Sequence, residues 1–142
     1  MTLNRQDRKT LSNAMNKEQY EYLANQIFQS ALEVHKYLGP GLLESVYEYA
    51  LVKELQLRTI EVLYQVKVPL FYKGNDTGKE FFIDILVENE IVIEVKSVDA
   101  LHPVHQAQLL SYLKLSDKRL GFLINFNVAL IKDGFKRMVN NY

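Results

Sequence analysis

The spacing of apolar residues changes partway along this chain, from every third or fourth position to every second position. The first spacing is that of an amphipathic helix, and it covers residues 18–38 and again residues 43–55. Between the two runs stands Gly39-Pro40-Gly41, a combination that ends a helix. The pattern therefore predicts two helices before any strand.

The second spacing, with a period of two, is typical of β-strands and begins near residue 61. The expected elements are a strand at 61–72, a hairpin loop at 74–78, a return strand at 79–87 and, after a tight connection at Asn89-Glu90, a third strand at 91–98. Such short connections join antiparallel neighbours. We therefore expect three consecutive strands in a meander.

A third helix is expected at 103–115, where Pro103 suits the first turn and His102 or Asp99 can cap it. The remaining expected elements are a strand at 120–126 and a terminal hairpin within 130–139 whose turn is Asp133-Gly134. Helices and strands both recur along the chain. This mixture predicts an α/β domain.

The 142 residues fit one globular domain, expected at 17–142 after a flexible N-terminal segment at 1–16. No apolar run approaches the roughly 20 residues of a membrane span and no secretory signal is recognisable, so we expect a cytoplasmic protein without membrane partners. A net charge of zero excludes the broad basic surface of avid nucleic-acid binders. Because cysteine is absent, a metal would need oxygen or imidazole ligands, which favours Mg²⁺ or Mn²⁺ over zinc.

Three ionisable residues, Asp84, Glu94 and Lys96, lie in the most apolar predicted strands. Because side chains alternate along a strand, we expect Glu94 and Lys96 on one side of the sheet, and Asp84 on the side opposite Ile83 and Ile85. The three groups converge if the two strands are adjacent. Buried charges are costly unless they are paired or bind a metal. The cluster therefore predicts either a divalent-cation site or a structural ion pair between Lys96 and a carboxylate.

In a catalytic site of this kind, two carboxylates and a backbone carbonyl hold a hard cation that activates a phosphodiester and an attacking water. Lys96 would neutralise charge on the phosphoryl group or orient the water. Glu44 and Tyr47 lie three apart in the second helix and share one face. Glu44 is either a further metal ligand or base, or a charge that favours the helix N-terminus.

The third helix carries a polar stripe made of His105, Gln108 and Tyr112, spaced along one face of a leucine-rich segment. Gln108 can bridge a bound water to the backbone, and Tyr112 can donate a hydrogen bond to a phosphate. His105 is more simply interpreted as a surface histidine. The stripe predicts polar neighbours for this helix, which the strand cluster would supply.

In this order, the motifs resemble the GxxExxY protein family, which is assigned to the PD-(D/E)XK nuclease superfamily. The resemblance runs from about residue 20 to the C-terminus and is carried by HKYLGPGLLESVY (35–47), DILV (84–87), IEVK (93–96), QLLSYL (108–113) and GFLINF (121–126). It implies a restriction-endonuclease-like core with a central mixed sheet flanked by helices. It also implies one or two Mg²⁺ ions and hydrolysis of DNA or RNA phosphodiester bonds.

The resemblance assigns a role to each polar residue of the cluster. Glu44 corresponds to the helix acid, Asp84 to the metal-ligating aspartate, Glu94 and Lys96 to the E-x-K pair, and Gln108 and Tyr112 to the Q-x-x-x-Y element of RecB-like nucleases. One departure is visible, because many relatives carry an arginine two residues before the aspartate and this chain has Phe82. A phosphate contact of those relatives is therefore expected to be missing.

The leading hypothesis is a nuclease that depends on Mg²⁺ or Mn²⁺ and hydrolyses phosphodiester bonds of DNA or RNA. The expected metal ligands are Asp84, Glu94, the Val95 carbonyl and Glu44, and the expected catalytic set adds Lys96, Gln108 and Tyr112. The alternatives are a non-catalytic module that keeps the nuclease fold and binds nucleic acid or protein, and a structural protein in which the cluster is a salt-bridge network. A homodimer or larger complex would enlarge the binding surface of so small a domain.

Overall fold

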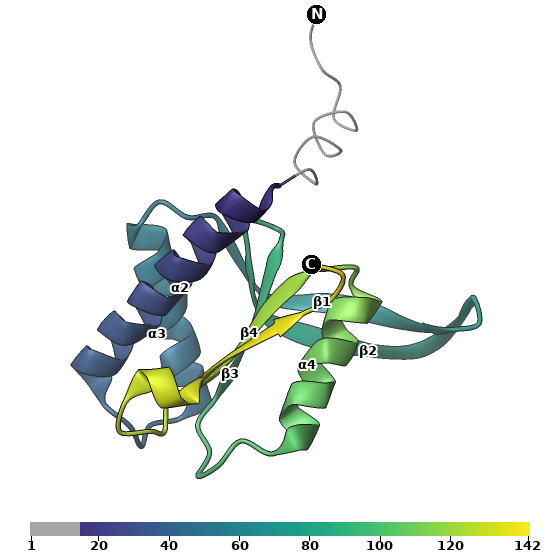
Figure 1. Cartoon of the computed structure of the whole chain (residues 1–142). Coiled ribbons are helices and arrows are strands. Elements are labelled where there is room, and N and C mark those ends of the chain that lie inside the picture. Colours follow the sequence, from purple (N-terminus) through teal and green to yellow (C-terminus); the bar gives the residue numbers. More distant parts are fainter. Residues whose placement is uncertain (1–14) are drawn as a thin grey trace, which may run out of the picture.

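Five strands form one mixed sheet in the computed structural model, which describes residues 15–142, and their spatial order follows the chain (Figure 1). Neighbouring strands are antiparallel except β3 and β4, which are parallel because a helix connects them. The elements are α2 (Lys17–Leu38), α3 (Glu44–Leu57), β1 (Val62–Tyr72), β2 (Asn75–Val87), β3 (Ile91–Lys96), α4 (Pro103–Leu115), β4 (Leu120–Asn125), a 3-10 helix (Ile131–Gly134) and β5 (Phe135–Val139). The predicted α/β fold, with two helices before the first strand, is confirmed.

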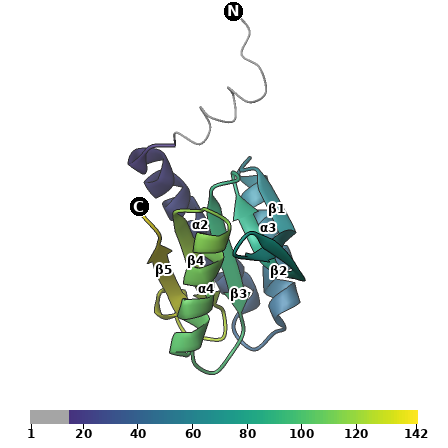
Figure 2. The same ribbon diagram turned by 90° about the vertical axis from the view of Figure 1, so that its right-hand side faces the viewer.

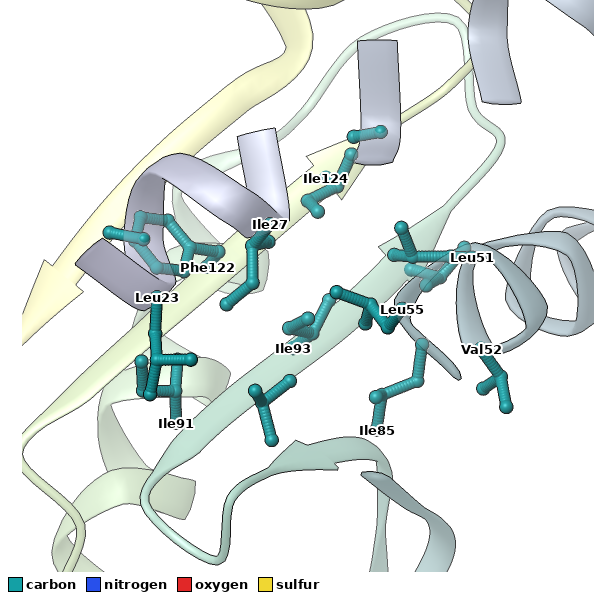
Figure 3. Packing of buried hydrophobic residues seen from close by; sticks show 14 of the residues in the cluster. Leu23, Ile27, Leu51, Val52, Leu55, Ile85, Ile91, Ile93, Phe122 and Ile124 are labelled. Carbon is teal, nitrogen blue, oxygen red and sulfur yellow. The ribbon is translucent and has the colours of Figure 1, made fainter. Parts of the chain in front are cut away.

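Helices α2 and α3 cover one face of the sheet and α4 covers the other, so the chain forms three layers (Figures 1 and 2). Between the sheet and the α2–α3 pair lies the larger core, where Ile27 and Leu51 belong to the same apolar cluster as Ile93 (Figure 3). A smaller core beneath α4 contains Leu109 and Leu113. Strands β3 and β4 are thus buried on both faces, which explains their nearly continuous apolar sequences.

The β1–β2 hairpin is longer than the sequence predicts and extends beyond α4 (Figure 1). Its turn is Lys73-Gly74, with φ of 48° and 80°, and Tyr72 pairs directly with Asn75. The hairpin loop predicted at 74–78 is therefore wrong, because residues 75–78 belong to β2. Two residues with positive φ give the twist that a two-residue hairpin requires, so the polar residues after the turn continue the strand.

The C-terminal segment forms a hairpin with β4 and not the local hairpin that the sequence predicts. Strand β5 pairs antiparallel with β4, and Asp133-Gly134 ends the 3-10 helix instead of turning between two strands. The predicted turn at Asp133-Gly134 is therefore wrong. Gly134 is required instead for close packing against β4. A Cβ atom on Gly134 would lie 2.1 Å from the carbonyl oxygen of Asn125.

Replacing that glycine tests this packing. Gly134→Ala is expected to lower the free energy of unfolding by about 2 kcal/mol, because a backbone atom of β4 must move to admit the methyl group. Urea denaturation of the purified protein measures the change. The control is Gly78→Ala, whose Cβ meets no atom within 4 Å and which adds only backbone strain at a φ of 72°. A loss for Gly134→Ala no larger than that of the control would contradict the steric argument.

The described chain begins with two residues that the sequence assigns to the flexible segment at 1–16. Asn16 caps α2, because its Oδ1 accepts from the Gln19 N–H at 2.8 Å and its own N–H donates to Gln19 Oε1 at 2.9 Å. Met15 packs against the larger core. The rest of the predicted segment, 1–14, lies outside the described residues. No helix within 15–142 is long and apolar enough to cross a membrane.

Candidate active site

Strands β2 and β3 part at the position of the predicted aspartate. Their backbone pairing runs from Val87 and Ile91 to Ile85 and Ile93 and ends there. One residue further, the side chain of Asp84 takes the place of the ladder, since its Oδ2 accepts a hydrogen bond from the Val95 N–H at 2.9 Å. The side chain of Asp84 therefore bridges β2 and β3 where regular sheet pairing stops.

The alternation of side chains also breaks at Asp84. Ile83 packs in the core beneath α4, whereas Ile85 packs in the core beneath α2 and α3. The prediction that these two isoleucines share one face is therefore wrong. Gln65 of β1 explains the break, because it lies between the residues paired with Ile83 and Ile85 and has a φ of 50°. Such a conformation is uncommon outside glycine, and here it accompanies a local irregularity in both strands.

Glu94 is the most deeply buried acid of the cluster, with 6% of its surface exposed. Its Oε1 lies 3.4 Å from the backbone nitrogen of Asp84, which donates to it. Burial raises the pKa of Glu94 to about 9, and the charge of Asp84 adds to the rise, while Lys96 opposes it. At neutral pH and without a bound cation, Glu94 therefore holds a proton.

Lys96 and Tyr112 lie close enough to this pair to interact with it electrostatically. Lys96 is half-buried at the end of β3, and its charge acts on Glu94. Within the described part of the chain it forms no ion pair with a carboxylate, so the purely structural ion pair considered above is not present. Tyr112 stacks on Phe81 of β2, with ring centroids 4.1 Å apart. Burial raises the pKa of Tyr112, and the charges of Glu94 and Asp84 add to it.

Helix α3 contributes an acid that the sequence does not single out. Glu44 is exposed in the first turn, and Glu48, one turn later, is half-buried. The Nε2 amide of Gln65 donates to Glu48 Oε1 at 2.8 Å and also reaches Asp84 Oδ1 at 3.4 Å. Burial raises the pKa of Glu48, and the charges of Asp84 and Glu44 raise it further. The sequence signal was the spacing of four residues between two glutamates, which places both on one helix face.

Tyr47 fixes the start of α3 and does not point its hydroxyl at the acids. Its hydroxyl donates to the Gly39 carbonyl at 2.5 Å and accepts from the Leu42 N–H at 3.1 Å. The fully buried ring stacks on Phe126, with centroids 4.6 Å apart. The Leu42 carbonyl in turn accepts from Ser97 Oγ at 2.6 Å. These contacts tie the loop before α3 to the segment that follows Lys96.

The predicted stripe on α4 is only partly joined to the cluster. Tyr112 is, as described, but Gln108 is exposed and makes no side-chain hydrogen bond within residues 15–142. His105 accepts a hydrogen bond from the His102 N–H through Nδ1 at 3.1 Å. This contact caps the start of α4 and involves none of the acids of the candidate site. Its interpretation as a satisfied surface histidine agrees with this geometry.

A buried asparagine that the sequence does not single out holds the chain after β3. Asn125, at the end of β4, accepts from the Val98 N–H at 3.1 Å and donates to the Val98 carbonyl at 2.9 Å. Only 2% of its surface is exposed. A buried amide satisfied in this way is costly to lose, so the segment after Lys96 is held in one position relative to the sheet.

Comparison with known proteins identifies the family. The sequence profile of the PD-(D/E)XK nuclease superfamily matches residues 21–138, which include every strand but the last residue of β5 and all three helices but the first residues of α2. Searches of curated proteins and of solved structures found no significant match. The matched region contains the split between β2 and β3 and both acids at that split. The chain belongs to the PD-(D/E)XK nuclease superfamily.

Proposed function

We propose that this protein is a nuclease that uses Mg²⁺ or Mn²⁺ to hydrolyse phosphodiester bonds of nucleic acids, and that it belongs to the GxxExxY group within its superfamily. One observation carries the proposal. Asp84 and Glu94 are held together where two strands part, and only 6% of the surface of Glu94 is exposed. An arrangement that forces a carboxyl group to keep its proton is costly for folding and is typical of a functional site.

The chemistry of the donors fits a hard divalent cation. Asp84 and Glu94 offer carboxylate oxygens, and the Val95 carbonyl is the further ligand predicted from the sequence. Within residues 15–142, no group of three acidic or imidazole side chains could by itself hold a metal ion. Mg²⁺ commonly keeps several waters and binds through one or two carboxylates together with substrate, so this pair is a suitable donor set. Glu44 and Glu48 on α3 would act through such waters.

The chain's own residues supply the rest of the proposed mechanism. When bound, the cation supplies Lewis-acid activation of the phosphodiester and of the attacking water. Asp84 is kept in position by the Val95 N–H, and Gln65 orients Glu48 toward it. The Lys96 ammonium stabilises negative charge that develops on the phosphoryl oxygens. Tyr112 donates a hydrogen bond to the phosphate, and Gln108, from the same helix, positions the water.

Cleavage and metal binding test the proposal together. Supercoiled plasmid, single-stranded DNA and single-stranded RNA are each incubated with the protein and Mg²⁺, Mn²⁺ or EDTA, and products are resolved on gels. We expect cleavage of at least one substrate only with metal, and a rise of the melting temperature with Mg²⁺ or Mn²⁺ because the ion binds only the folded state.

The outcome that contradicts the proposal is tight, metal-independent binding of nucleic acid without cleavage of any substrate. That result would identify the non-catalytic binding module instead. A structural role predicts neither cleavage nor a response to the ion. The predicted cytoplasmic location and the predicted dimer or larger assembly stay predictions, and size-exclusion chromatography with light scattering measures the assembly.

A further inference from the structure

We propose that a groove along α3 binds the unpaired nucleic-acid strand next to the scissile phosphodiester. The inference deepens the proposed nuclease function and rests on it. The groove has a volume of about 330 Å³ and lies between α3 and β1. It is lined by Ser45, Glu48, Tyr49, Val52, Lys53 and Gln56 of α3 and by Tyr64 of β1.

The lining residues follow one side of the helix. From Ser45 to Gln56 they recur at spacings of three, four, seven and eight residues, so they form a continuous stripe. At 1.5 Å per residue, the stripe is about 16 Å long. The groove is therefore an extended track and not a closed cavity, which suits a polymer better than a compact small molecule.

One end of the groove adjoins the candidate active site. Glu48 lines the groove and also accepts the hydrogen bond from Gln65, whose amide reaches Asp84. Tyr64 is the residue before Gln65 in β1 and also lines the groove. A strand whose scissile phosphate lies at Asp84 and Glu94 can thus continue directly into the groove.

The chemistry of the lining matches an unpaired strand. Tyr49 and Tyr64 are 74% and 60% exposed, so both present most of their surface to solvent. Bases of a single strand stack on such rings, and a lysine among them meets the backbone phosphates. Lys53 is exposed and forms no ion pair within residues 15–142.

A duplex would not use these features, because its bases present only their edges in the grooves and stack on one another. Gln56 and Ser45 add hydrogen-bonding groups at the groove edge without favouring one base. A protein partner would favour a more apolar interface centre than this lining, whose one aliphatic residue, Val52, is buried. The observations therefore favour a single-stranded polynucleotide.

The test measures binding separately from catalysis. Fluorescence anisotropy of labelled oligothymidylate and oligouridylate is followed with wild type, Tyr64→Ala, Tyr49→Ala and Tyr64→Phe in Ca²⁺, with a duplex DNA of equal length for comparison. We expect each alanine variant to weaken single-strand binding about tenfold, because base stacking on one ring is lost. Tyr64→Phe should bind as wild type does. The two oligonucleotides distinguish DNA from RNA as the source of the strand.

The matched control is Tyr72→Ala, because Tyr72 is 64% exposed but lies at the β1–β2 turn and not in the groove. Equal binding by wild type and both groove variants, equal loss in the control, or no measurable single-strand binding by wild type would overturn the proposal. Bis(p-nitrophenyl) phosphate is a phosphodiester too small to reach the groove. Its cleavage with Mn²⁺ should be the same in all variants. Absence of metal-dependent cleavage of any nucleic acid by wild type, with groove-dependent binding intact, would contradict the nuclease function and leave the groove assignment standing.

Discussion

Asp84→Asn is expected to reduce nucleic-acid cleavage by about a thousandfold or more while leaving the fold intact. The asparagine Oδ1 can still accept the hydrogen bond that the Val95 N–H gives to Asp84. The substitution removes the negative charge of Asp84 that the cation requires. It also removes the repulsion between Asp84 and Glu94. Rates of cleavage under single-turnover conditions, and the melting temperature with and without Mg²⁺, measure the two effects.

The chain offers a close control for this substitution. Asp76 is also in β2 and also accepts a backbone N–H, that of Gly78 at 2.9 Å, but it is exposed in the distal part of the hairpin. Asp76→Asn should therefore keep full activity and metal response. Asp84→Ala is the less informative variant, because it leaves the Val95 N–H without its partner at a cost of about 1–3 kcal/mol. Wild-type cleavage by Asp84→Asn would refute the assignment of this residue as a metal ligand.

Glu94→Gln is expected to raise the free energy of unfolding of the metal-free protein at pH 8 by up to about 5 kcal/mol. The pKa of Glu94 in the fold is about 9 against an ordinary value of 4.5. A carboxyl group whose pKa is higher in the folded than in the unfolded state does not change the free energy of unfolding below its unfolded pKa. Above that value it lowers the free energy of unfolding, by an amount that grows as pH rises from 4.5 toward 9. Glutamine copies the protonated form and escapes this cost, so the difference between the two proteins should vanish near pH 4.

Urea denaturation at a series of pH values, with EDTA present, measures the difference. Glu80→Gln is the control, because Glu80 lies on the surface in an exposed ion pair with Lys67 at 3.1 Å and should change stability by no more than about 0.5 kcal/mol. Mg²⁺ should stabilise wild type and not Glu94→Gln. A difference that does not depend on pH would show that Glu94 is ionised in the fold and would remove the electrostatic argument for a cation.

The order of helices and strands was predictable because each element packs an apolar face against another. Helix α2 buries Leu23, Ile27 and Val34 at helical spacing, and β3 is apolar on both faces because helices cover both. The irregularity at Gln65 and Asp84 was not predictable, since a period of two continues through both residues in the sequence. The pairing of β1 with β2 breaks the alternation of side chains. Such pairing cannot be predicted from the pattern of one strand alone.

The same distinction applies to the candidate site. Asp84, Glu94 and Lys96 stand out because charge is rare in apolar strands. Glu48 does not stand out, because a glutamate on a helix is ordinary and its partner Gln65 lies 17 residues further along the chain. Gln108 was expected in the site and its side chain is exposed, so its role stays a prediction. Residues that act through tertiary contacts are visible only once the layers are assembled.

The agreement between strand order and chain order has a consequence for how the domain assembles. Each strand joins a neighbour that is already next to it in sequence, and only α4 intervenes between β3 and β4. The entropy lost on closing the connecting loop is therefore small for the antiparallel pair β2 and β3, and larger for β3 and β4, whose connection contains α4. Asp84 and Glu94 lie within one hairpin, so the two acids can meet early, before α3 docks and brings Glu48 to them. In this folding order the pair Asp84 and Glu94 forms first, and Glu48 of α3 joins the site last.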